Sequence, residues 1–254
     1  MFFRQLKYDL LFSRNMFLGI AALLLAAAVF MRIGDTLGVS EIAADVVAGF
    51  VVVMVVFAVA VLIAVFGTIV QIFNFYRKSI FGNSGYFFLT LPINKNLVLL
   101  SKVVTAIIWL NFMTFVGVLV GIIIFNRPPT EVVLVNLPTM LEIADVLWGL
   151  LSMNVMWLFL VGLLYFTVTL ANSVVGVRLN YVVGGTVGFV LFVGYSWLTY
   201  RLDMLLLDLP TESAAGFTIG VTGQHPAIMA VSFAAAVVLL VGCGYLLRYR
   251  VALE

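Results

Sequence analysis

The sequence predicts an all-α membrane protein with six transmembrane helices, an N-terminal interfacial amphipathic helix and both termini in the cytoplasm. Of its 254 residues, 65% are hydrophobic and only 9% are charged, whereas about a quarter of the residues in a soluble domain carry a charge. A membrane span needs roughly 20 apolar residues, and six stretches meet that length. These stretches are continuously apolar and lack the alternating polarity of an outer-membrane barrel strand.

The six spans are expected near residues 16–33, 43–73, 97–125, 146–170, 181–200 and 227–247. No soluble segment, low-complexity tail or fixed-period repeat interrupts them. The chain is therefore expected to form a single transmembrane domain over residues 1–254.

The basic residues give the expected orientation, because lysine and arginine are retained on the cytoplasmic side of a membrane. With a cytoplasmic N-terminus, most of the 13 basic residues fall inside: Arg4, Lys7, Arg14, Arg77, Lys78, Lys95, Lys102, Arg178, Arg248 and Arg250. Only Arg32, Arg127 and Arg201 fall outside. The acidic residues have the opposite distribution, with only Asp9 and Glu254 inside. Both termini are therefore expected in the cytoplasm.

The span centres contain no charged residue, which bears on the source of energy. Ion-coupled carriers and pumps keep ionisable groups inside the bilayer as relays or ion ligands. The polar residues expected inside these spans are only amides and hydroxyls, such as Gln71, Thr105, Asn154, Thr169 and Ser232. We expect them to form hydrogen bonds between helices. Energy is therefore expected to enter from outside the bilayer.

Residues 1–15 have the pattern of an amphipathic helix. Phe3, Leu6 and Leu10 recur at helical spacing, and the basic residues Arg4, Lys7 and Arg14 form a neighbouring stripe. Such a helix lies in the inner membrane interface with its cations toward anionic lipid head groups. It acts either as a simple anchor for the first span or, in addition, as a docking surface for a soluble partner.

Residues 73–102 form an aromatic and basic interruption that contains no acidic residue. A short amphipathic element is expected from Phe75 to Phe81, followed by a turn over Gly82–Gly85 and an extended Leu-Thr-Leu-Pro piece. The next long helix is expected to begin between Asn94 and Leu97. The charge distribution places this segment, with residues 74–96 as its loop, on the cytoplasmic side.

The outer loop over residues 201–226 combines an apolar stretch with acidic residues. A stretch this short does not span a bilayer, so it is expected to form a half-helix or re-entrant piece at the outer interface. The residues assigned to this segment are Met204, Leu205, Leu206, Asp208 and Glu212.

The sequence offers no catalytic, cofactor-binding or metal-binding set. His225 is the only histidine and Cys243 the only cysteine, so a zinc site or a histidine-activated nucleophile lacks its components. No G-x-x-x-x-G-K-[ST] phosphate loop is present, so the chain does not hydrolyse ATP by that route. The few basic residues lie near the membrane, which gives no support for nucleic-acid binding.

Residues 71–109 contain, in this order, Phe-Tyr-Arg-Lys, Gly-Tyr-Phe-Phe-Leu-Thr-Leu-Pro-Ile, Leu-Leu-Ser-Lys and then Trp109. This order resembles the first cytoplasmic loop of ABC-2 type permeases, the transmembrane subunits of bacterial ABC exporters. It implies a multi-pass protein of the bacterial plasma membrane that pairs with a second permease, the same chain or a different one. It also implies two soluble P-loop ATPase partners, which hold the ATP and Mg²⁺, and it implies export as the direction of transport.

The resemblance implies that residues 74–81 form a coupling helix that sits in a groove of the ATPase. The residues expected to make this contact are Phe75, Tyr76, Arg77, Lys78, Phe81, Gly85 and Tyr86. Many relatives carry an acidic residue in the following turn, where this chain has Asn83 and Ser84. The phenylalanine- and methionine-rich spans suit a hydrophobic or amphipathic cargo such as a peptide, lipid or drug. The alternatives are an ATPase-independent carrier or channel, or a membrane-embedded lipid-modifying enzyme.

Overall fold

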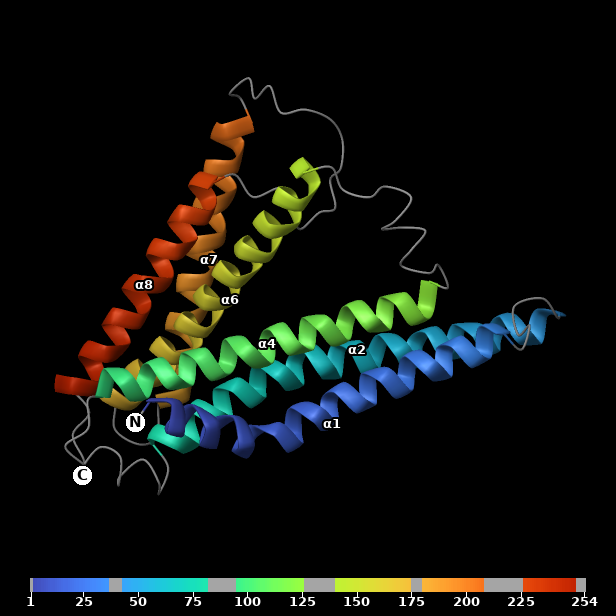
Figure 1. The fold of residues 1–254 in the computed structure, drawn as a ribbon, viewed down its shortest axis with the longest axis horizontal. Helices are drawn as coiled ribbons and strands as arrows, with labels where there is room; N and C mark the ends of the chain where they lie inside the picture. The colour runs from blue at the N-terminus through green and yellow to red at the C-terminus, as the bar shows by residue number, and fades with distance from the viewer. Residues whose placement is uncertain are drawn as a thin grey trace. The chain divides into compact units, whose positions relative to one another are not determined.

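The computed structural model describes residues 2–36, 43–81, 95–125, 140–174, 180–207 and 226–249. Every regular element in these ranges is an α-helix. In chain order, as Figure 1 shows, the helices are α1 (Phe2–Thr36), α2 (Ala43–Ile80), α4 (Lys95–Phe125), α6 (Met140–Val174), α7 (Asn180–Leu207) and α8 (Pro226–Tyr249).

Six of the described helices are long and apolar enough to cross a membrane. Their candidate spans are Phe2–Ile33, Phe57–Ile80, Lys95–Ile124, Leu147–Ser173, Val182–Leu205 and Pro226–Arg248. The predicted fold class, an all-α protein with six apolar helices, is therefore confirmed. The chain is a multi-pass membrane protein.

Several helices are longer than the sequence pattern predicts; α6, for example, runs from Met140 to Val174. α1 runs without interruption from Phe2 to Thr36, so the expected interfacial segment 1–15 and the first span are parts of one helix. α2 likewise continues to Ile80, and Phe75–Ile80 forms its last turns instead of a separate element. The first strong helix breaker after the apolar run is Gly82. The polar residues before it occupy one side of the helix and do not end it.

α7 also extends beyond its predicted span. It ends at Leu207, so Met204–Leu207 are its last turn and not the start of a separate half-helix. Met204 and Leu205 are exposed. Asp208, Glu212 and the rest of the predicted re-entrant segment up to residue 225 lie outside the described residues, and that fold stays a prediction.

The chain divides into two compact units. The N-terminal unit comprises residues 3–74 and 108–138, and the C-terminal unit comprises residues 1–2, 75–107 and 139–254. The last turns of α2 and the first half of α4 thus belong with α6, α7 and α8. The prediction of a single transmembrane domain stays a prediction.

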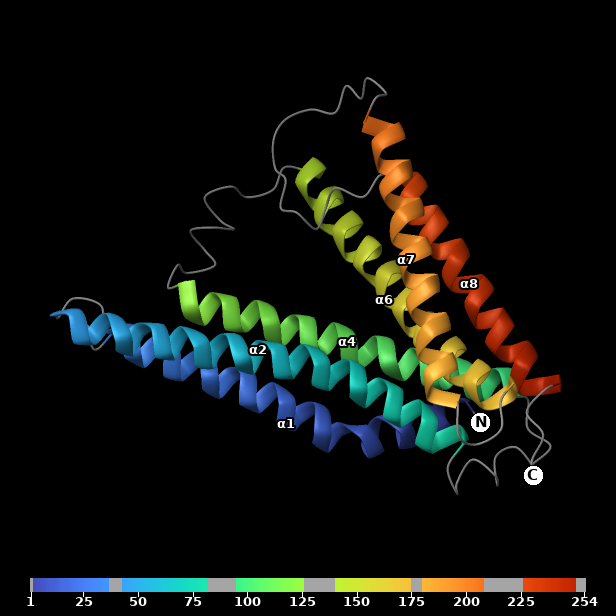
Figure 2. The ribbon, with the colours of Figure 1, turned by 180° about the vertical axis from the view of Figure 1, so that it is seen from behind.

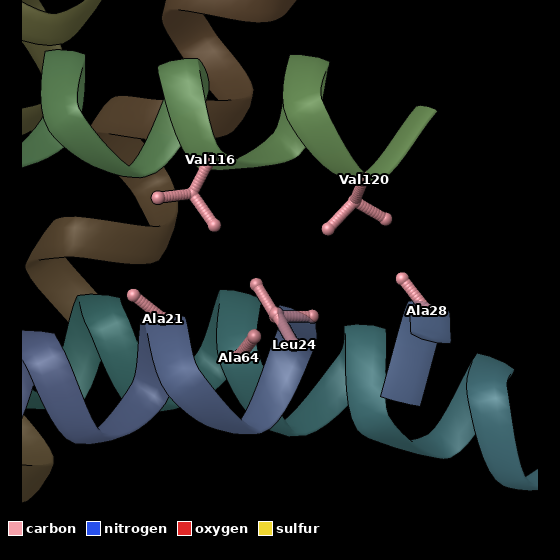
Figure 3. Packing of buried hydrophobic residues seen from close by; sticks show 6 residues of the cluster. All are labelled: Ala21, Leu24, Ala28, Ala64, Val116 and Val120. Atoms are coloured by element: carbon pink, nitrogen blue, oxygen red, sulfur yellow. The ribbon is translucent and has the colours of Figure 1, made fainter. Parts of the chain in front are cut away.

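In the N-terminal unit, α1, α2 and α4 run side by side (Figures 1 and 2). Figure 3 shows that Val116 and Val120 of α4 point toward α1 and α2. Opposite them lie mainly small side chains, and small residues let helix backbones approach closely in lipid. The buried members of this cluster are Ala21, Leu24, Ala28, Ala64, Val116 and Val120.

Three aromatic side chains join α1 to α4, closer to the start of α1 than the cluster of small residues. The rings of Phe17 and Trp109 are stacked, with centroids 4.7 Å apart and an interplanar angle of 9°. Phe112 meets Trp109 edge-on at 5.5 Å. The indole N–H of Trp109 donates a hydrogen bond to the Ser13 hydroxyl at 2.7 Å. Trp109 therefore joins the two helices by both packing and a hydrogen bond.

In the C-terminal unit, α6 packs along α8 and also against α7. Two glycines permit a close approach of α6 and α8. A Cβ atom at Gly162 would lie 3.4 Å from the Ala236 carbonyl oxygen, and one at Gly242 would lie 3.0 Å from the Phe166 ring. α6 and α8 therefore form a tightly packed helix pair.

The contact of α6 with α7 depends on glycines of α7. A Cβ atom at Gly184 would lie 2.8 Å from Cβ of Ala171, and one at Gly188 would lie 2.8 Å from Cγ2 of Thr167. Real Cβ atoms essentially never come this close, so a side chain at either position requires neighbouring atoms to shift.

Replacing Gly188 with alanine is expected to destabilise the protein by about 1–3 kcal/mol, the usual range for an overpacked contact. Because the clash is with the Thr167 methyl group, Thr167→Ser in the same chain should restore most of the loss. Serine keeps the hydroxyl that donates to the Leu164 carbonyl at 2.9 Å. Thermal melting in detergent measures both effects.

Gly185→Ala is the matched control, because a Cβ atom there meets nothing within 4 Å. It should melt no lower than the unmodified chain. Equal melting temperatures for Gly188→Ala and Gly185→Ala would contradict the close contact of α6 and α7.

The described polar groups of the spans form hydrogen bonds both within and between helices. Many hydroxyls donate to a carbonyl three or four residues earlier in their own helix, as Thr105 does to Ser101 at 2.8 Å and Ser152 does to Gly149 at 2.9 Å. This local bond satisfies the hydroxyl in an apolar setting without a second helix. Hydrogen bonds between helices, which the sequence predicts, are present as well: Ser232 lies 2.7 Å from Tyr195, Thr169 lies 2.7 Å from Tyr76, and the Gln71 amide bonds to the Met16 sulfur.

Candidate functional site

The last turns of α2 carry most of the described residues that the sequence assigns to the coupling contact. Phe75, Tyr76 and Ile80 are buried, whereas Arg77 and Lys78 are exposed. Residues four apart lie on one face of a helix, so Tyr76 and Ile80 face inward together and the two cations face away. Cations in the last turn also interact favourably with the helix dipole. This end of α2 therefore has a buried aromatic side and an exposed basic side.

Tyr76 is the centre of a buried polar cluster that joins three helices. Its side chain is fully buried. Its hydroxyl oxygen lies 2.7 Å from Oγ1 of Thr169 on α6 and 3.1 Å from Sγ of Cys243 on α8. Thr169 Oγ1 and Cys243 Sγ are themselves 3.1 Å apart. The three side chains, which we call the Tyr76 cluster, form a closed triangle of contacts.

The directions of these hydrogen bonds follow from the number of protons. The Thr169 hydroxyl donates its one proton to the Tyr165 carbonyl at 2.8 Å. Tyr76 must then donate to Thr169, because each hydroxyl has a single proton to donate. The weak S–H donor of Cys243 has acceptors in the lone pairs of the Tyr76 oxygen at 3.1 Å and in the Tyr165 carbonyl at 3.8 Å. Each donor of the Tyr76 cluster thus has an acceptor.

Stacked rings surround the Tyr76 cluster. The ring of Tyr76 stacks on that of Tyr165 with centroids 3.9 Å apart and an interplanar angle of 12°. Phe81, which is half-buried, meets Tyr76 edge-on at 6.3 Å. Stacked and edge-to-face pairs add stabilisation beyond the area they bury. Tyr76 therefore contacts α6 through its ring and also through its hydroxyl.

The beginning of α4 contacts the same region. Lys102 is only 3% exposed, and its ammonium group lies 4.7 Å from the ring centroid of Phe75, a cation–π contact. The Tyr165 hydroxyl donates to the Lys102 carbonyl at 3.2 Å. These contacts connect the start of α4 to the end of α2 and to α6.

The first turn of α4 also contacts α8. The ammonium group of Lys95 donates to the Leu247 carbonyl at 3.3 Å, near the end of α8. A Cβ atom at Gly244 would lie 3.2 Å from Oδ1 of Asn96, so the glycine allows α8 to approach α4 here. Both helices that flank residues 82–94 are therefore held against α8.

The remaining predicted residues lie as follows. Arg4, Lys7 and Arg14 are exposed on α1, while Asp9 and Ser13 on its other side are buried. The expected basic stripe is thus present on the surface, and its placement at a membrane interface stays a prediction. Gly85 and Tyr86 lie outside the described residues, and so does the side chain of Leu206.

Several residues of this region are not indicated by sequence patterns. Tyr165 and Cys243 occur in apolar spans and look there like ordinary packing residues, whereas Thr169 is expected to bond to another helix without a named partner. The one available signal is the spacing of four between Tyr165 and Thr169, which places them on one helix face. Lys102 has the charge of a loop residue, yet it lies in the third turn of α4 and is buried.

Phe75 and Tyr76 thus face into the C-terminal unit, whereas Arg77 and Lys78 are exposed. No family model, no curated protein and no solved structure matches this chain.

Proposed function

We propose that this chain is the permease subunit of an ABC-2 type exporter in a bacterial plasma membrane. It pairs with a second permease and binds soluble P-loop ATPases, which supply the energy of ATP and Mg²⁺. Its cargo is hydrophobic or amphipathic. This proposal accounts for a multi-pass chain whose sequence has no ATPase motif of its own.

The observation that carries the proposal is the two-sided end of α2. Arg77 and Lys78 are exposed directly beside the fully buried Tyr76. A soluble partner that binds these cations holds a rigid helix end whose opposite side is packed against α6 and α8. Exposed cations suit recognition of an acidic surface, and the buried side suits transfer of movement into the membrane.

The proposed coupling follows from population shift. ATP binding changes the permease only to the extent that the partner binds one of its conformations better than the other. A partner in contact with Arg77 and Lys78 meets this requirement if the end of α2 occupies a different position in each conformation. The partner then stabilises one position of α2, and α6 and α8 follow.

Charge reversal of both cations tests the proposal. The chain is expressed together with its neighbouring genes and purified by a tag on the chain, and any P-loop ATPase that is captured with it is measured. The double variant Arg77→Glu, Lys78→Glu should reduce capture of the ATPase at least about tenfold, which corresponds to about 1.4 kcal/mol. Opposed like charges would cost several kcal/mol at such an interface, so the effect should be clear at physiological salt.

Arg201→Glu is the matched control. Arg201 is exposed and lies 5.6 Å from the Trp197 ring at the end of α7, in the segment expected on the outer side. Its reversal should leave capture unchanged. Failure of the unmodified chain to bring down the ATPase, or equal capture by the double variant, would be evidence against the proposal.

A further inference from the structure

The Tyr76 cluster has a second property, which concerns how movement of α2 reaches the other helices. We infer that Tyr76 is the positioning residue that transmits displacement of the exposed end of α2 to α6 and α8 together. This inference rests on the proposed function and adds to it the pathway within the chain. It assigns a distinct role to the ring and to the hydroxyl of one side chain.

The ring transmits movement toward α6. It lies 3.9 Å from the Tyr165 ring and nearly parallel to it. Closely packed groups resist compression, because protein interiors are as dense as organic crystals. Tyr76 directly precedes Arg77 in a continuous helix, so any displacement of the exposed cations toward α6 also displaces this ring.

The hydroxyl transmits movement away from α6. Its hydrogen bond to Thr169 ties α2 to α6, and its contact with Cys243 ties α2 to α8. The Tyr76 cluster is buried in the protein, so a broken hydrogen bond would leave a polar group without a partner. The end of α2 therefore does not withdraw without either breaking these bonds or moving the two helices with it.

α6 and α8 are suited to move as one body. The glycines Gly162 and Gly242 bring them into close contact at two levels. Cys243 lies beside Gly242, so the hydroxyl of Tyr76 reaches the pair at one of these close contacts. A displacement delivered at this point acts on both helices and does not separate them.

The geometry also supplies a measurable reporter. Cys243 is the only cysteine of the chain, and it is fully buried under the Tyr76 hydroxyl. Tyr76, Thr169 and the Tyr165 carbonyl contact the thiol, so opening of the Tyr76 cluster would uncover it. The rate at which N-ethylmaleimide modifies Cys243 therefore measures this opening, with mass spectrometry distinguishing the chain from cysteines of the ATPase.

The first measurement uses the chain alone in lipid nanodiscs. Tyr76→Phe keeps the stacked ring and removes both contacts of the hydroxyl, so it should increase the rate of Cys243 modification about tenfold. Tyr195→Phe is the control: it removes a half-buried hydroxyl 2.7 Å from Ser232 while keeping the ring stacked on Phe159 at 3.8 Å. It should leave the rate unchanged. An equal rate for Tyr76→Phe and the unmodified chain overturns the inference.

The second measurement adds the P-loop ATPase with and without a non-hydrolysable ATP analogue. In the unmodified complex, the nucleotide should change the modification rate at least threefold. In Tyr76→Phe the rate should be high and insensitive to nucleotide, and cargo moved per ATP hydrolysed should fall at least threefold although capture of the ATPase persists. A merely structural hydroxyl would raise the rate by the same factor in both states and leave the nucleotide effect intact.

The outcomes separate the two proposals. If no ATPase binds the unmodified chain, the proposed function fails and the inference fails with it. If the ATPase binds and drives transport, but nucleotide leaves Cys243 modification unchanged, the proposed function stands and the inference alone is overturned. The same holds if Tyr76→Phe retains both the nucleotide effect and the full transport yield per ATP.

Discussion

Replacing Trp109 with alanine is expected to be among the most destabilising single substitutions in the N-terminal unit. The change removes the stack on Phe17, the edge contact with Phe112 and the hydrogen bond to Ser13. Truncating a buried tryptophan to alanine typically costs about 3–5 kcal/mol. With about 2–4 °C per kcal/mol for a chain of this size, the melting temperature in detergent should fall by roughly 10 °C.

Two control variants separate the effect of the lost hydrogen bond, and of truncating any tryptophan, from the effect of the lost packing. Trp109→Phe keeps an aromatic ring and loses the hydrogen bond, so it should cost only about 1 kcal/mol. Trp197→Ala truncates a tryptophan whose side chain is exposed and should change the melting temperature little. If Trp109→Ala melted within about 2 °C of the unmodified chain, the packing of α1 on α4 at this level would be wrong.

Helix content is the part of this fold that the sequence predicts well. Six apolar runs of sufficient length are a direct consequence of the bilayer's thickness, and the predicted starts of α2 and α4 agree with Ala43 and Lys95. The predicted break near residue 73 is wrong for a physical reason. Asn74, Arg77 and Lys78 lower the hydropathy of the sequence, but polar residues do not by themselves end a helix. α2 continues to Ile80, two residues before Gly82.

The contacts of the candidate site were not predictable from one sequence. Tyr76 is separated from Thr169 by 93 residues and from Cys243 by 167. Helical periodicity indicates which face a residue occupies, but it does not give the rotation or the axial register of one apolar helix against another. The sequence therefore identifies the end of α2 as unusual, and the direction of each side chain comes from the structure.

The side-chain directions change the interpretation of the residues predicted to make the coupling contact. In the sequence, Phe75, Tyr76, Arg77, Lys78 and Phe81 look like one set of anchors for a partner. In the structure the cations and the rings face opposite ways. Under the proposed function, the two cations bind the partner, and Tyr76 connects them to the membrane helices.

Replacing Tyr76 with alanine should therefore combine a large loss of stability with a loss of coupling. The substitution removes a fully buried ring and leaves a cavity beside Tyr165, for which about 3–5 kcal/mol is expected. Tyr76→Phe keeps the ring and loses only the hydroxyl contacts, so its melting temperature should lie between those of the alanine variant and the unmodified chain.

A double-mutant cycle with Tyr165→Ala tests whether the stacked rings act as a unit. Each single substitution destroys the same stack, so the second should cost less once the first is present. The expected interaction energy is about 0.5–1.5 kcal/mol, the range measured for aromatic pairs beyond their buried area. Strictly additive losses would mean that the two rings stabilise the protein independently. Tyr165 would then not be the surface against which α2 presses, and the transmission of movement from α2 to α6 would need another route.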